Sequence, residues 1–540
     1  MKKHLLPFII LALLSACAPT RPQPAPVKPT SPAIKEIPPN AWWDDAIFYE
    51  IFVRSFYDSD NNGIGDFNGI TAKLDYLEEL GINAIWLMPI HPSPSYHGYD
   101  VLNYYAVNHE YGTMDDFKHL LEEAHKRDMH IIIDLVLNHT SSQHPFFVDA
   151  NNNPQSPYRS WYIWEENYPG WGGNLWHEGN QGYYYGLFWS GMPDLNYNNP
   201  AVTEQMEKVI RYWLNDIGVD GFRLDAIKHL IEDGQVTENT ATTHEWLRSF
   251  YVTYKADSLY AYTVGEVYGA GGFIASTYTG AQLDHVFNFE LASGFVNSAN
   301  GGSNTGINSA FTLTLKDMPD GEYATFLTNH DQNRAMSVFY GNLGKAKIAA
   351  SLMLMSPDTP FIYYGEEIGM LGKKPDEDIR LPMQWSSAEN AGFSESKPWR
   401  TVDTGYPQTN VVAQMDNPDS LLSHYRTLIA LRNTYPALRT GETLILDTGT
   451  SAIFASLRIQ GDEAILILIN LTKEPVGDYA LSGANIPLDD ETYKSISLFP
   501  KGHVVNDDTL PDVSLLAATI SGYHPLAELP PYSTFILQLR

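Results

Sequence analysis

The chain has 540 residues, 44% of them hydrophobic, which is too long for one simple core and predicts two or three globular parts. It carries 34 basic and 64 acidic residues, and its formal net charge of -30 argues against nucleic acid and anionic membrane surfaces as partners. A neutral substrate is unaffected by such a field. Charged residues make up only 18% of the chain, so the imbalance reflects scarce lysine and arginine as much as abundant acid.

An export signal is predicted at the N-terminus. Two lysines, at positions 2 and 3, precede an apolar run over 5–14 that is too short for a mature membrane span but has signal-peptide length. The run ends in LSAC, which resembles a bacterial lipoprotein signal, and Cys17 is the only cysteine of the chain. We interpret residues 1–17 as a lipoprotein signal peptide with Cys17 as the lipidated residue. An ordinary secretory signal is the alternative.

The next segment, residues 18–40, is predicted to be a tether. It is proline-rich and has no regular apolar period, as expected of a semi-rigid spacer that holds a folded body away from a membrane. No later stretch is long and apolar enough to cross a bilayer, so we expect membrane contact only through the lipid anchor. The predicted protein is a monomeric, exported bacterial lipoprotein of the cell envelope or extracellular surface.

From residue 42 onward, short apolar strands alternate with amphipathic helices, as a parallel sheet requires. Between the first two strands, residues 69–81 are predicted to form one helix, because Ile70, Leu74, Leu77 and Leu80 share a face. The predicted strands are AIFYEIFVRSF (46–56), INAIWLMPI (82–90), HIIIDLVLNH (130–139), VDGFRLDAI (219–227), AYTVGEV (261–267), HVFNFE (285–290), YATFLTNHD (323–331) and TPFIYYGEE (359–367). The predicted fold class is therefore α/β, a (β/α)8 TIM barrel formed by residues 41–139 and 199–437.

Two parts of the chain depart from this alternation. Residues 140–198 are crowded with tryptophan and tyrosine, and we interpret them as a subdomain inserted after the third strand, since long loops in compact proteins are functional or disordered and aromatic content excludes disorder. Residues 438–540 contain AIFASLRI, EAILILINL and STFILQL, which alternate or run apolar at strand length between turns. They predict a C-terminal antiparallel β-sandwich domain.

Three carboxylates come near the ends of predicted strands: Asp225 in VDGFRLDAI, Glu266 in AYTVGEV and Asp331 in YATFLTNHD. Active sites of (β/α)8 barrels form at the C-terminal ends of the strands, so we expect the three acids to converge on one cavity. Helix caps or surface ion pairs are the usual role of such residues. However, these runs should be buried, and a buried acid needs a partner or a task. Glycoside hydrolysis uses such acids, one as nucleophile and one as proton donor.

The alternation of side chains along a strand supports different chemical roles for Asp225 and Glu266. Residues two apart on a strand face the same side, so Arg223 and Asp225 should point together into the barrel mouth, where the guanidinium keeps Asp225 ionised as a nucleophile. Glu266 should face two other carboxylates in a poorly solvated cleft, which raises its proton affinity and suits a general acid. Attack by Asp225 followed by hydrolysis through Glu266 predicts retention of the anomeric configuration.

Four segments resemble, in order and spacing, the signature segments of the α-amylase family, glycoside hydrolase family 13. They are DLVLNH (134–139), GFRLDAIKH (221–229), GEV (265–267) and TNHD (328–331). The resemblance extends to HGYD (97–100), MPDLN (192–196) and RLPMQW (380–385). It implies Asp225 as nucleophile, Glu266 as general acid and base, and Asp331 as a third acid that holds sugar hydroxyls and stabilises the transition state.

The same resemblance implies substrate contacts around the acids. His139 and His330 would donate hydrogen bonds to hydroxyls of the sugar at the cleavage point, and Tyr99 would stack beneath its ring. A Lys-His pair after the nucleophile is similar to that of enzymes cutting α-1,4 bonds, with Lys228 touching the sugar beyond the scissile bond. Independently of the resemblance, we expect most aromatic rings of the insert to form its own core and others to stack on sugar rings. The predicted substrate-binding residues are Tyr99, His139, Arg223, Lys228, His229 and His330.

A structural Ca²⁺ is predicted in DSDNNGIGD (58–66), where oxygen donors recur every second residue around a glycine-rich turn. The loop resembles a calcium loop of the oligo-1,6-glucosidase branch of the family, and a solvated polar turn is the alternative. The predicted ligands are the side chains of Asp58, Asp60, Asn62 and Asp66 and the carbonyl of Ile64.

A second structural Ca²⁺ is predicted between the barrel and the insert. Its ligands would be Asn138, Asp194 and the carbonyl of His229, with the remaining ligand left open. Neither ion is expected to act in catalysis.

The predicted activity is that of a retaining, endo-acting α-1,4-glucan hydrolase, an α-amylase acting on starch or maltooligosaccharides. MPDLN lies between the patterns of the oligo-1,6-glucosidase and neopullulanase branches, whereas Ala226 and the Lys-His pair favour α-1,4 cleavage. One alternative is an α-glucosidase or a neopullulanase/cyclomaltodextrinase-like enzyme with α-1,6 or transglycosylation activity. An alternative of another class is a noncatalytic glycan-binding relative, against which the three intact acids argue.

Overall fold

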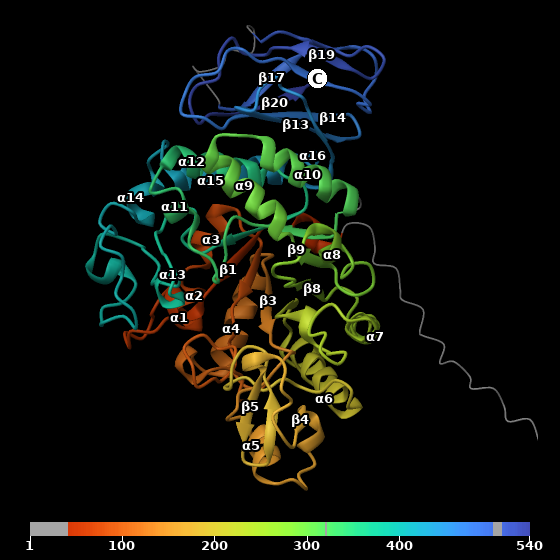
Figure 1. Cartoon of the computed structure of the whole chain (residues 1–540). Helices are drawn as coiled ribbons and strands as arrows, with labels where there is room; N and C mark the ends of the chain where they lie inside the picture. Colours follow the sequence, from red (N-terminus) through yellow and green to blue (C-terminus); the bar gives the residue numbers. More distant parts are fainter. Residues whose placement is uncertain (1–40, 319–320, 501–509) are drawn as a thin grey trace, which may run out of the picture. The chain divides into compact units, whose positions relative to one another are not determined.

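The structure is a computed structural model that describes residues 41–318, 321–500 and 510–540 (Figure 1). The predicted lipoprotein signal with Cys17 and the predicted tether at 18–40 lie outside the described residues, so both stay predictions. Among the helices within the described ranges, none is long and apolar enough to cross a bilayer.

Eight parallel strands close into a barrel in the order β1-β11-β10-β9-β8-β7-β3-β2. Their bounds are β1 (Phe48–Ile51), β2 (Ala84–Leu87), β3 (His130–Leu135), β7 (Gly221–Leu224), β8 (Tyr262–Gly265), β9 (His285–Phe287), β10 (Tyr323–Thr325) and β11 (Thr359–Tyr363). Each strand lies inside one of the eight predicted segments, which confirms the (β/α)8 barrel. The strands are three to six residues long and shorter than the predicted segments, because the apolar run of a segment continues past the end of its strand.

The first predicted strand is wrong in its second half. Strand β1 ends at Ile51, and the residues after it form the short helix α1 (Val53–Phe56). All four residues of α1 are buried. A continuous apolar run therefore spans the change from strand to helix, and such a run has no period that distinguishes the two.

Helices connect the successive strands of the barrel. Their bounds include α4 (Met114–His125), α6 (Pro200–Arg211), α7 (Ala241–Asp257), α9 (Phe289–Gly301), α10 (Thr305–Asp317), α12 (Leu343–Leu354) and α15 (Leu421–Thr434). The helix predicted over 69–81 is in fact two, α2 (Phe67–Thr71) and α3 (Leu74–Leu80), because Lys73 leaves the helical region with φ −113° and ψ 5°. The predicted apolar face is nevertheless buried in both helices. The helical spacing of its apolar residues therefore continues across the break between α2 and α3.

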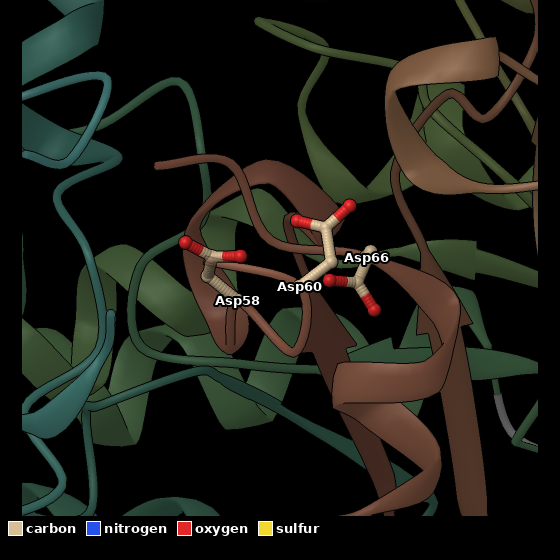
Figure 2. A group of neighbouring side chains, drawn as sticks. All are labelled: Asp58, Asp60 and Asp66. Atoms are coloured by element: carbon tan, nitrogen blue, oxygen red, sulfur yellow. The ribbon is translucent and has the colours of Figure 1, made fainter. Parts of the chain in front are cut away.

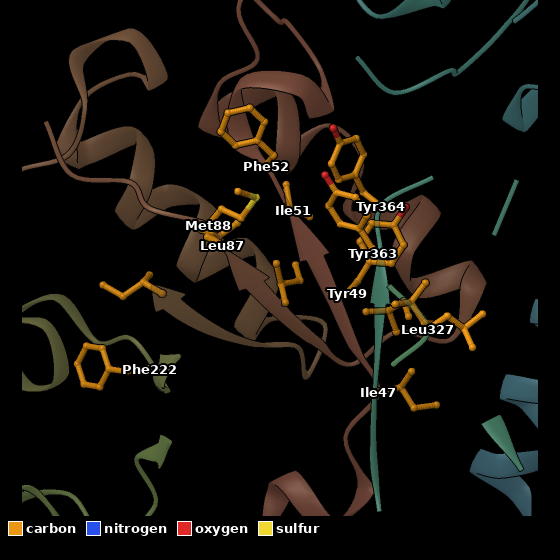
Figure 3. Close-up of a cluster of buried hydrophobic side chains, with 14 of the residues drawn as sticks. Ile47, Tyr49, Ile51, Phe52, Leu87, Met88, Phe222, Leu327, Tyr363 and Tyr364 are labelled. Carbon is orange, nitrogen blue, oxygen red and sulfur yellow. The ribbon is translucent and has the colours of Figure 1, made fainter. Parts of the chain in front are cut away.

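Alternation along the strands separates two layers of core. On β1, Phe48 points into the barrel, where it stacks on Phe361 at 4.3 Å between ring centroids. The residues on either side of it point outward: Figure 3 shows Ile47, Tyr49 and Ile51 in the cluster between the barrel and its helices. The same period places Glu50 on the inward side with Phe48.

The segment between β3 and α6 forms the insert. It contains helix α5 (Pro145–Asn152) and a three-stranded antiparallel sheet in the order β4 (Trp164–Glu165), β6 (Gly182–Tyr185), β5 (Trp176–Gly179). Phe147 of α5 packs against the rings of Tyr162 and Tyr184 at 5.0 and 4.8 Å. Most of the aromatic side chains therefore form the insert's own core, whereas Phe188 and Trp189 are each 50% exposed.

The C-terminal domain is antiparallel, as predicted. Its five-stranded sheet has the order β12 (Glu442–Ile445), β13 (Ile453–Gln460), β14 (Glu463–Asn470), β20 (Thr534–Leu539), β17 (Ser495–Phe499). One face packs on residues of the domain itself, and the other contacts the barrel helices, where Phe454 stacks on Phe311 at 5.7 Å. Burial of both faces explains why β13 and β14 read as nearly continuous apolar runs.

Candidate active site

The carboxylates of Asp225, Glu266 and Asp331 line one pocket of about 290 Å³. Asp225 directly follows β7, Glu266 directly follows β8, and Asp331 lies in the loop after β10, so all three come from the C-terminal ends of barrel strands. The structure thus brings together the three acids whose convergence was predicted. The pocket is also lined by His97, Tyr99, His139, Phe188, Trp189, Met192, Asp376 and Arg380.

A larger cavity of about 790 Å³ lies elsewhere and contains none of the predicted site residues. Its lining includes Asp284, Tyr323 and Thr359, which stand at the N-terminal ends of β9, β10 and β11. In (β/α)8 barrels this end serves stability, while catalysis occurs at the opposite end. The smaller pocket is therefore the candidate active site.

Arg223 donates hydrogen bonds to three acidic side chains at the site. It is 1% exposed, and its partner in the register between β3 and β7 is Asp134. Its Nη1 donates to Asp134 Oδ1 at 2.9 Å and to Asp225 Oδ1 at 2.7 Å. Its Nη2 donates to Glu266 Oε2 at 2.7 Å. One buried guanidinium thus holds Asp225 and Glu266 side by side, and it faces the same side as Asp225, as the strand period predicted.

The pKa of the Glu266 carboxyl is raised above its ordinary value. Burial is the main cause, and the charges of Asp225 and Asp331 add to it, although Arg223 acts in the opposite direction. The backbone N–H of Ala226, whose φ of 49° lies in the left-handed region, also donates to Glu266 Oε2 at 3.2 Å. The direction of the shift suits a group that must carry a proton into the reaction.

His330 lies between two carboxylates. Its Nδ1 donates to Glu50 Oε1 at 2.5 Å, and its Nε2 lies 3.2 Å from Asp331 Oδ2. Burial alone would lower the pKa of His330, but Asp331 and Glu50 outweigh it and raise this pKa to about 10. Burial alone would raise the pKa of Asp331, but His330 and Arg380 hold it well below its usual range. Asp331 is therefore an ionised carboxylate beside a protonated imidazole.

Tyr99 and His139 complete the floor of the pocket. The Tyr99 hydroxyl donates to Asp134 Oδ2 at 3.0 Å and lies 2.7 Å from His330 Nε2. His139 Nε2 lies 3.2 Å from the backbone carbonyl of Tyr99. Burial lowers the pKa of His139 to about 4, so its imidazole is neutral at neutral pH. A neutral ring in the pocket wall can exchange hydrogen bonds with an uncharged ligand.

Lys228 and His229 are not among the residues that line the pocket. Lys228 forms an ion pair with Glu238, and His229 Nδ1 bonds with the carbonyl of Thr237 at 2.8 Å. Both side chains are thus engaged by the loop that follows the nucleophile. Their predicted contacts with a sugar stay predictions.

Arg380 is the first residue of RLPMQW and has a role at the site that the sequence did not predict. The side chain is 3% exposed, its Nη2 donates to Asp331 Oδ1 at 2.9 Å, and its Nε donates to the His330 carbonyl at 3.0 Å. Glu50 was missed as well, because a single acid inside an apolar first strand carries no local signal of its partner. Arg380 contacts Asp331 directly, whereas Glu50 contacts His330, which lies beside Asp331.

The predicted calcium loop brings its three acids together (Figure 2). Asp58, Asp60 and Asp66 each place one oxygen within 4.8 Å of the others. The pKa of Asp60 is raised, first by loss of solvation and then by its carboxylate neighbours. Gly63, with φ 94°, closes the turn where a Cβ would lie 2.3 Å from the Lys397 carbonyl oxygen. A cluster of three carboxylates, in which the pKa of Asp60 is raised, fits a site for a hard cation.

At the predicted second site, Asn138 and Asp194 are each 1% exposed and adjacent, with Asn138 Nδ2 donating to Asp194 Oδ2 at 3.0 Å. Asn138 Oδ1 is buried and has no hydrogen-bond partner within the described residues. Burial, and then the charge of Glu232, raise the pKa of Asp194 well above its ordinary value. An orphaned amide oxygen beside a buried carboxylate fits a cation ligand set. The part assigned to the His229 carbonyl stays a prediction.

Similarity to known proteins covers the whole barrel. The family model described as "Alpha amylase, catalytic domain" matches residues 50–441. Alpha-amylase 3 of Dictyoglomus thermophilum is 42% identical over 441 residues, which cover 80% of this chain and 86% of that protein. Oligo-1,6-glucosidase of Parageobacillus thermoglucosidasius is 34% identical over 520 residues, which cover 81% of this chain and 91% of that protein. The crystal structure of α-amylase from H. orenii is 37% identical with a TM-score of 0.78, covering 92% of this chain and 99% of that one.

Three observations support the same family assignment. They are the resemblance of the signature segments, the closed barrel and the acids at its C-terminal end. The signature segments predicted from sequence fall inside the matched range. The chain therefore belongs to the α-amylase family and is a glycoside hydrolase of family 13.

Proposed function

We propose that this glycoside hydrolase is a retaining, endo-acting α-amylase that cleaves α-1,4 bonds in starch or maltooligosaccharides. The observation that carries the proposal is the bridge formed by Arg223, whose terminal nitrogens hold Asp225 and Glu266 at 2.7 Å each. A pair of neighbouring carboxyl groups, one nucleophilic and one protonated, is what double displacement at a sugar requires. The 42% identity to Alpha-amylase 3 supports the α-1,4 assignment.

In the proposed mechanism Asp225 attacks the anomeric carbon and forms a covalent ester. Arg223 orients the attacking carboxylate and compensates its negative charge. Glu266, whose pKa is raised by burial, gives its proton to the departing sugar oxygen. A water molecule then loses a proton to Glu266 and hydrolyses the ester. Two inversions at the same carbon leave the anomeric configuration retained.

The remaining pocket residues are proposed to hold the sugar at the cleavage point. Asp331 stays ionised and accepts hydrogen bonds from hydroxyls, because His330 and Arg380 keep its pKa low. Neutral His139 and the Tyr99 ring contact the same sugar from the pocket wall. Lys228 exchanges its contact with Glu238 for a contact with the next sugar.

A second candidate is an α-glucosidase or neopullulanase-like enzyme with α-1,6 activity. The observation in its favour is the 34% identity to Oligo-1,6-glucosidase over 91% of that protein. The Ala226 and Lys228-His229 sequence favours α-1,4 cleavage instead.

Product analysis separates the two candidates. The full chain is incubated with maltoheptaose labelled at its reducing end and, separately, with pullulan. Internal cleavage of maltoheptaose from the first time point is expected, with the α-anomer as first product by NMR. Stepwise release of glucose from the non-reducing end, or α-1,6 cleavage of pullulan as the faster reaction, would favour the second candidate. Asp225→Asn is the inactive control.

We also propose two features that support the enzyme without taking part in its chemistry. One is structural Ca²⁺ in the loop of Asp58, Asp60 and Asp66, with Asn62 and the Ile64 carbonyl, where the ion would neutralise the clustered charge. A further Ca²⁺ at Asn138 and Asp194 would pair with the orphaned amide oxygen.

The other proposed feature is a lipid on Cys17 that anchors the exported protein in the cell envelope. The sequence LSAC and the solitary cysteine support it. Labelling of the full chain with a palmitate analogue in a bacterial host, with Cys17→Ser as control, tests this anchor. Equal labelling of both proteins would reject it.

A further inference from the structure

Trp189 differs from the other tryptophans of the chain. Each of the others packs against at least one aromatic ring. Within the described residues Trp189 has no ring partner and its indole N–H has no hydrogen bond, although it lines the pocket that holds Asp225, Glu266 and Asp331. It is also 50% exposed. A large aromatic surface is thus open to a ligand at the mouth of the active site.

The indole of Trp189 packs against the backbone of Gly191, and we call this contact its seat. A Cβ added at Gly191 would lie 2.1, 2.3 and 2.5 Å from three neighbouring atoms of the six-membered ring of Trp189. Similar distances to three adjacent ring atoms place that Cβ over the face of the ring. The missing side chain at Gly191 therefore lets the indole lie flat against the backbone. Because one face is covered in this way, the exposed area belongs to the opposite face and the edges.

Hydrogen bonds fix the turn that carries this seat. The backbone N–H of Met192 donates to the Trp189 carbonyl at 3.0 Å, and the N–H of Ser142 donates to the carbonyl of residue 191 at 2.8 Å. The hydroxyl of Tyr184, from the core of the insert, donates to the carbonyl of Ser190 at 2.7 Å. The platform is therefore held rigidly before any ligand arrives, which lowers the entropic cost of binding on it.

We infer that Trp189, seated on Gly191, is a stacking platform for a glucosyl unit at the mouth of the pocket, beyond the two units joined by the cleaved bond, and that it gives the enzyme a preference for long α-glucan chains. The inference rests on the proposed α-amylase function. A pyranose ring presents C–H groups on its faces, and burial of these against an indole is favourable while the hydroxyls stay in water. A chain too short to reach the platform gains nothing from it.

The ratio of kcat/KM for maltoheptaose to kcat/KM for maltotriose measures this gain. Trp189→Ala is expected to lower the ratio roughly tenfold, mainly through a higher KM for maltoheptaose, which equals about 1.4 kcal/mol of binding. Gly191→Ala is expected to lower it in the same direction, because the added methyl group displaces the indole without removing it. Trp189→Phe keeps a smaller ring and should fall between these variants and the wild type.

Tyr168→Ala is the matched control, since Tyr168 is 47% exposed in the same insert and does not line the pocket. Its ratio should equal that of the wild type. An unchanged ratio in Trp189→Ala, or an equal loss on both substrates, overturns the inference.

A binding measurement separates this inference from the proposed function. Calorimetric titration of maltoheptaose into Glu266→Gln, with and without Trp189→Ala, reports on the platform without turnover. A lower affinity in the double variant supports the platform even if the wild type proves to cleave a different bond. Equal affinities refute it even if the wild type is an α-amylase. Thermal melting of each variant verifies that it is folded.

Discussion

His330 donates a hydrogen bond from Nδ1 to the carboxylate of Glu50 at 2.5 Å, although the two residues lie 280 positions apart in the chain. Glu50 points inward from β1 and is 2% exposed. Together with Asp331 it outweighs the effect of burial and raises the pKa of His330 to about 10. A protonated ring carries a proton on both nitrogens, and Nε2 lies 2.7 Å from the Tyr99 hydroxyl and 3.2 Å from Asp331 Oδ2. Glu50 is therefore a positioning residue that acts on Asp331 through His330.

Glu50→Gln is expected to lower kcat/KM by roughly tenfold at neutral pH, because His330 loses the carboxylate that accepts from its Nδ1 and is held less firmly beside Asp331. It should also move the alkaline limb of the pH–rate profile to lower pH, since the pKa of His330 falls when its carboxylate partner is removed. Steady-state kinetics from pH 5 to about 10 measure both effects. A variant that loses activity with an unshifted profile would assign Glu50 a purely structural role.

The same pair predicts how stability depends on pH. In the folded protein the pKa of His330 is about 10, above its ordinary value of 6.5. The protonated ring therefore contributes its full stabilisation below about pH 6.5, and the contribution is lost as pH rises from there through 10. The free energy of unfolding in urea should fall over this window, and the fall should be smaller in Glu50→Gln. Parallel curves for the two proteins would contradict this assignment.

Arg223→Gln is expected to destabilise the fold by about 3–5 kcal/mol and to abolish hydrolysis. The reason is that Asp134, Asp225 and Glu266 share this one buried guanidinium, and its removal leaves buried charge without a partner. Urea unfolding and activity measure the two effects. Arg127→Gln removes an arginine with carboxylate partners at the surface and should cost at most about 1 kcal/mol. Similar losses for the two variants would argue against a special role for the buried bridge.

The convergence of Asp225, Glu266 and Asp331 could be predicted because two general rules suffice for it. Strand period two fixes which residues share a side, and the barrel fixes which strand ends carry the site. The partners of these acids could not be predicted in the same way. Glu50 and Arg380 reach the site from distant parts of the chain, and no local pattern records which residues meet across a closed barrel.

The insert shows a second limit of sequence reasoning. Its tryptophans and tyrosines look alike in the sequence, yet Tyr162 is 1% exposed in its core and Trp189 is 50% exposed at the pocket. The contact of Trp189 with Gly191 carries no sequence signal, because a glycine among turn residues is not unusual. Lys228 is a related case, because the sequence favoured a sugar contact and the structure adds Glu238 as a competing partner.

Glu266→Gln is expected to lower kcat by about 10²–10⁴-fold while retaining affinity for soluble starch, because the amide keeps the shape of the side chain and cannot donate the proton. The raised pKa of Glu266 adds a second expectation: the acidic form needed for attack persists to higher pH than an ordinary glutamate would allow. Turnover and starch affinity electrophoresis check both properties. Near-normal turnover in this variant would show that another group is the acid.

Removal of metal should lower the melting temperature. If Ca²⁺ occupies the loop of Asp58, Asp60 and Asp66, its binding stabilises the fold by about 2.7 kcal/mol at a free concentration one hundred times Kd, and EDTA removes this contribution. Asp60→Asn should weaken the dependence on added Ca²⁺, because Asp60 is the exposed member of the cluster and its carboxylate repels its neighbours when no cation is bound. Asp75→Asn, at an acid outside the loop with a 79% exposed side chain, is the matched control. An unchanged melting curve in EDTA, together with no calcium by elemental analysis of the untreated protein, would reject the metal site.

The same melting experiment tests the second site. If the effect of EDTA on the melting temperature persists in Asp60→Asn and disappears in Asn138→Leu, the ion lies instead at the buried site beside Asp194, where the amide oxygen has no protein partner among the described residues.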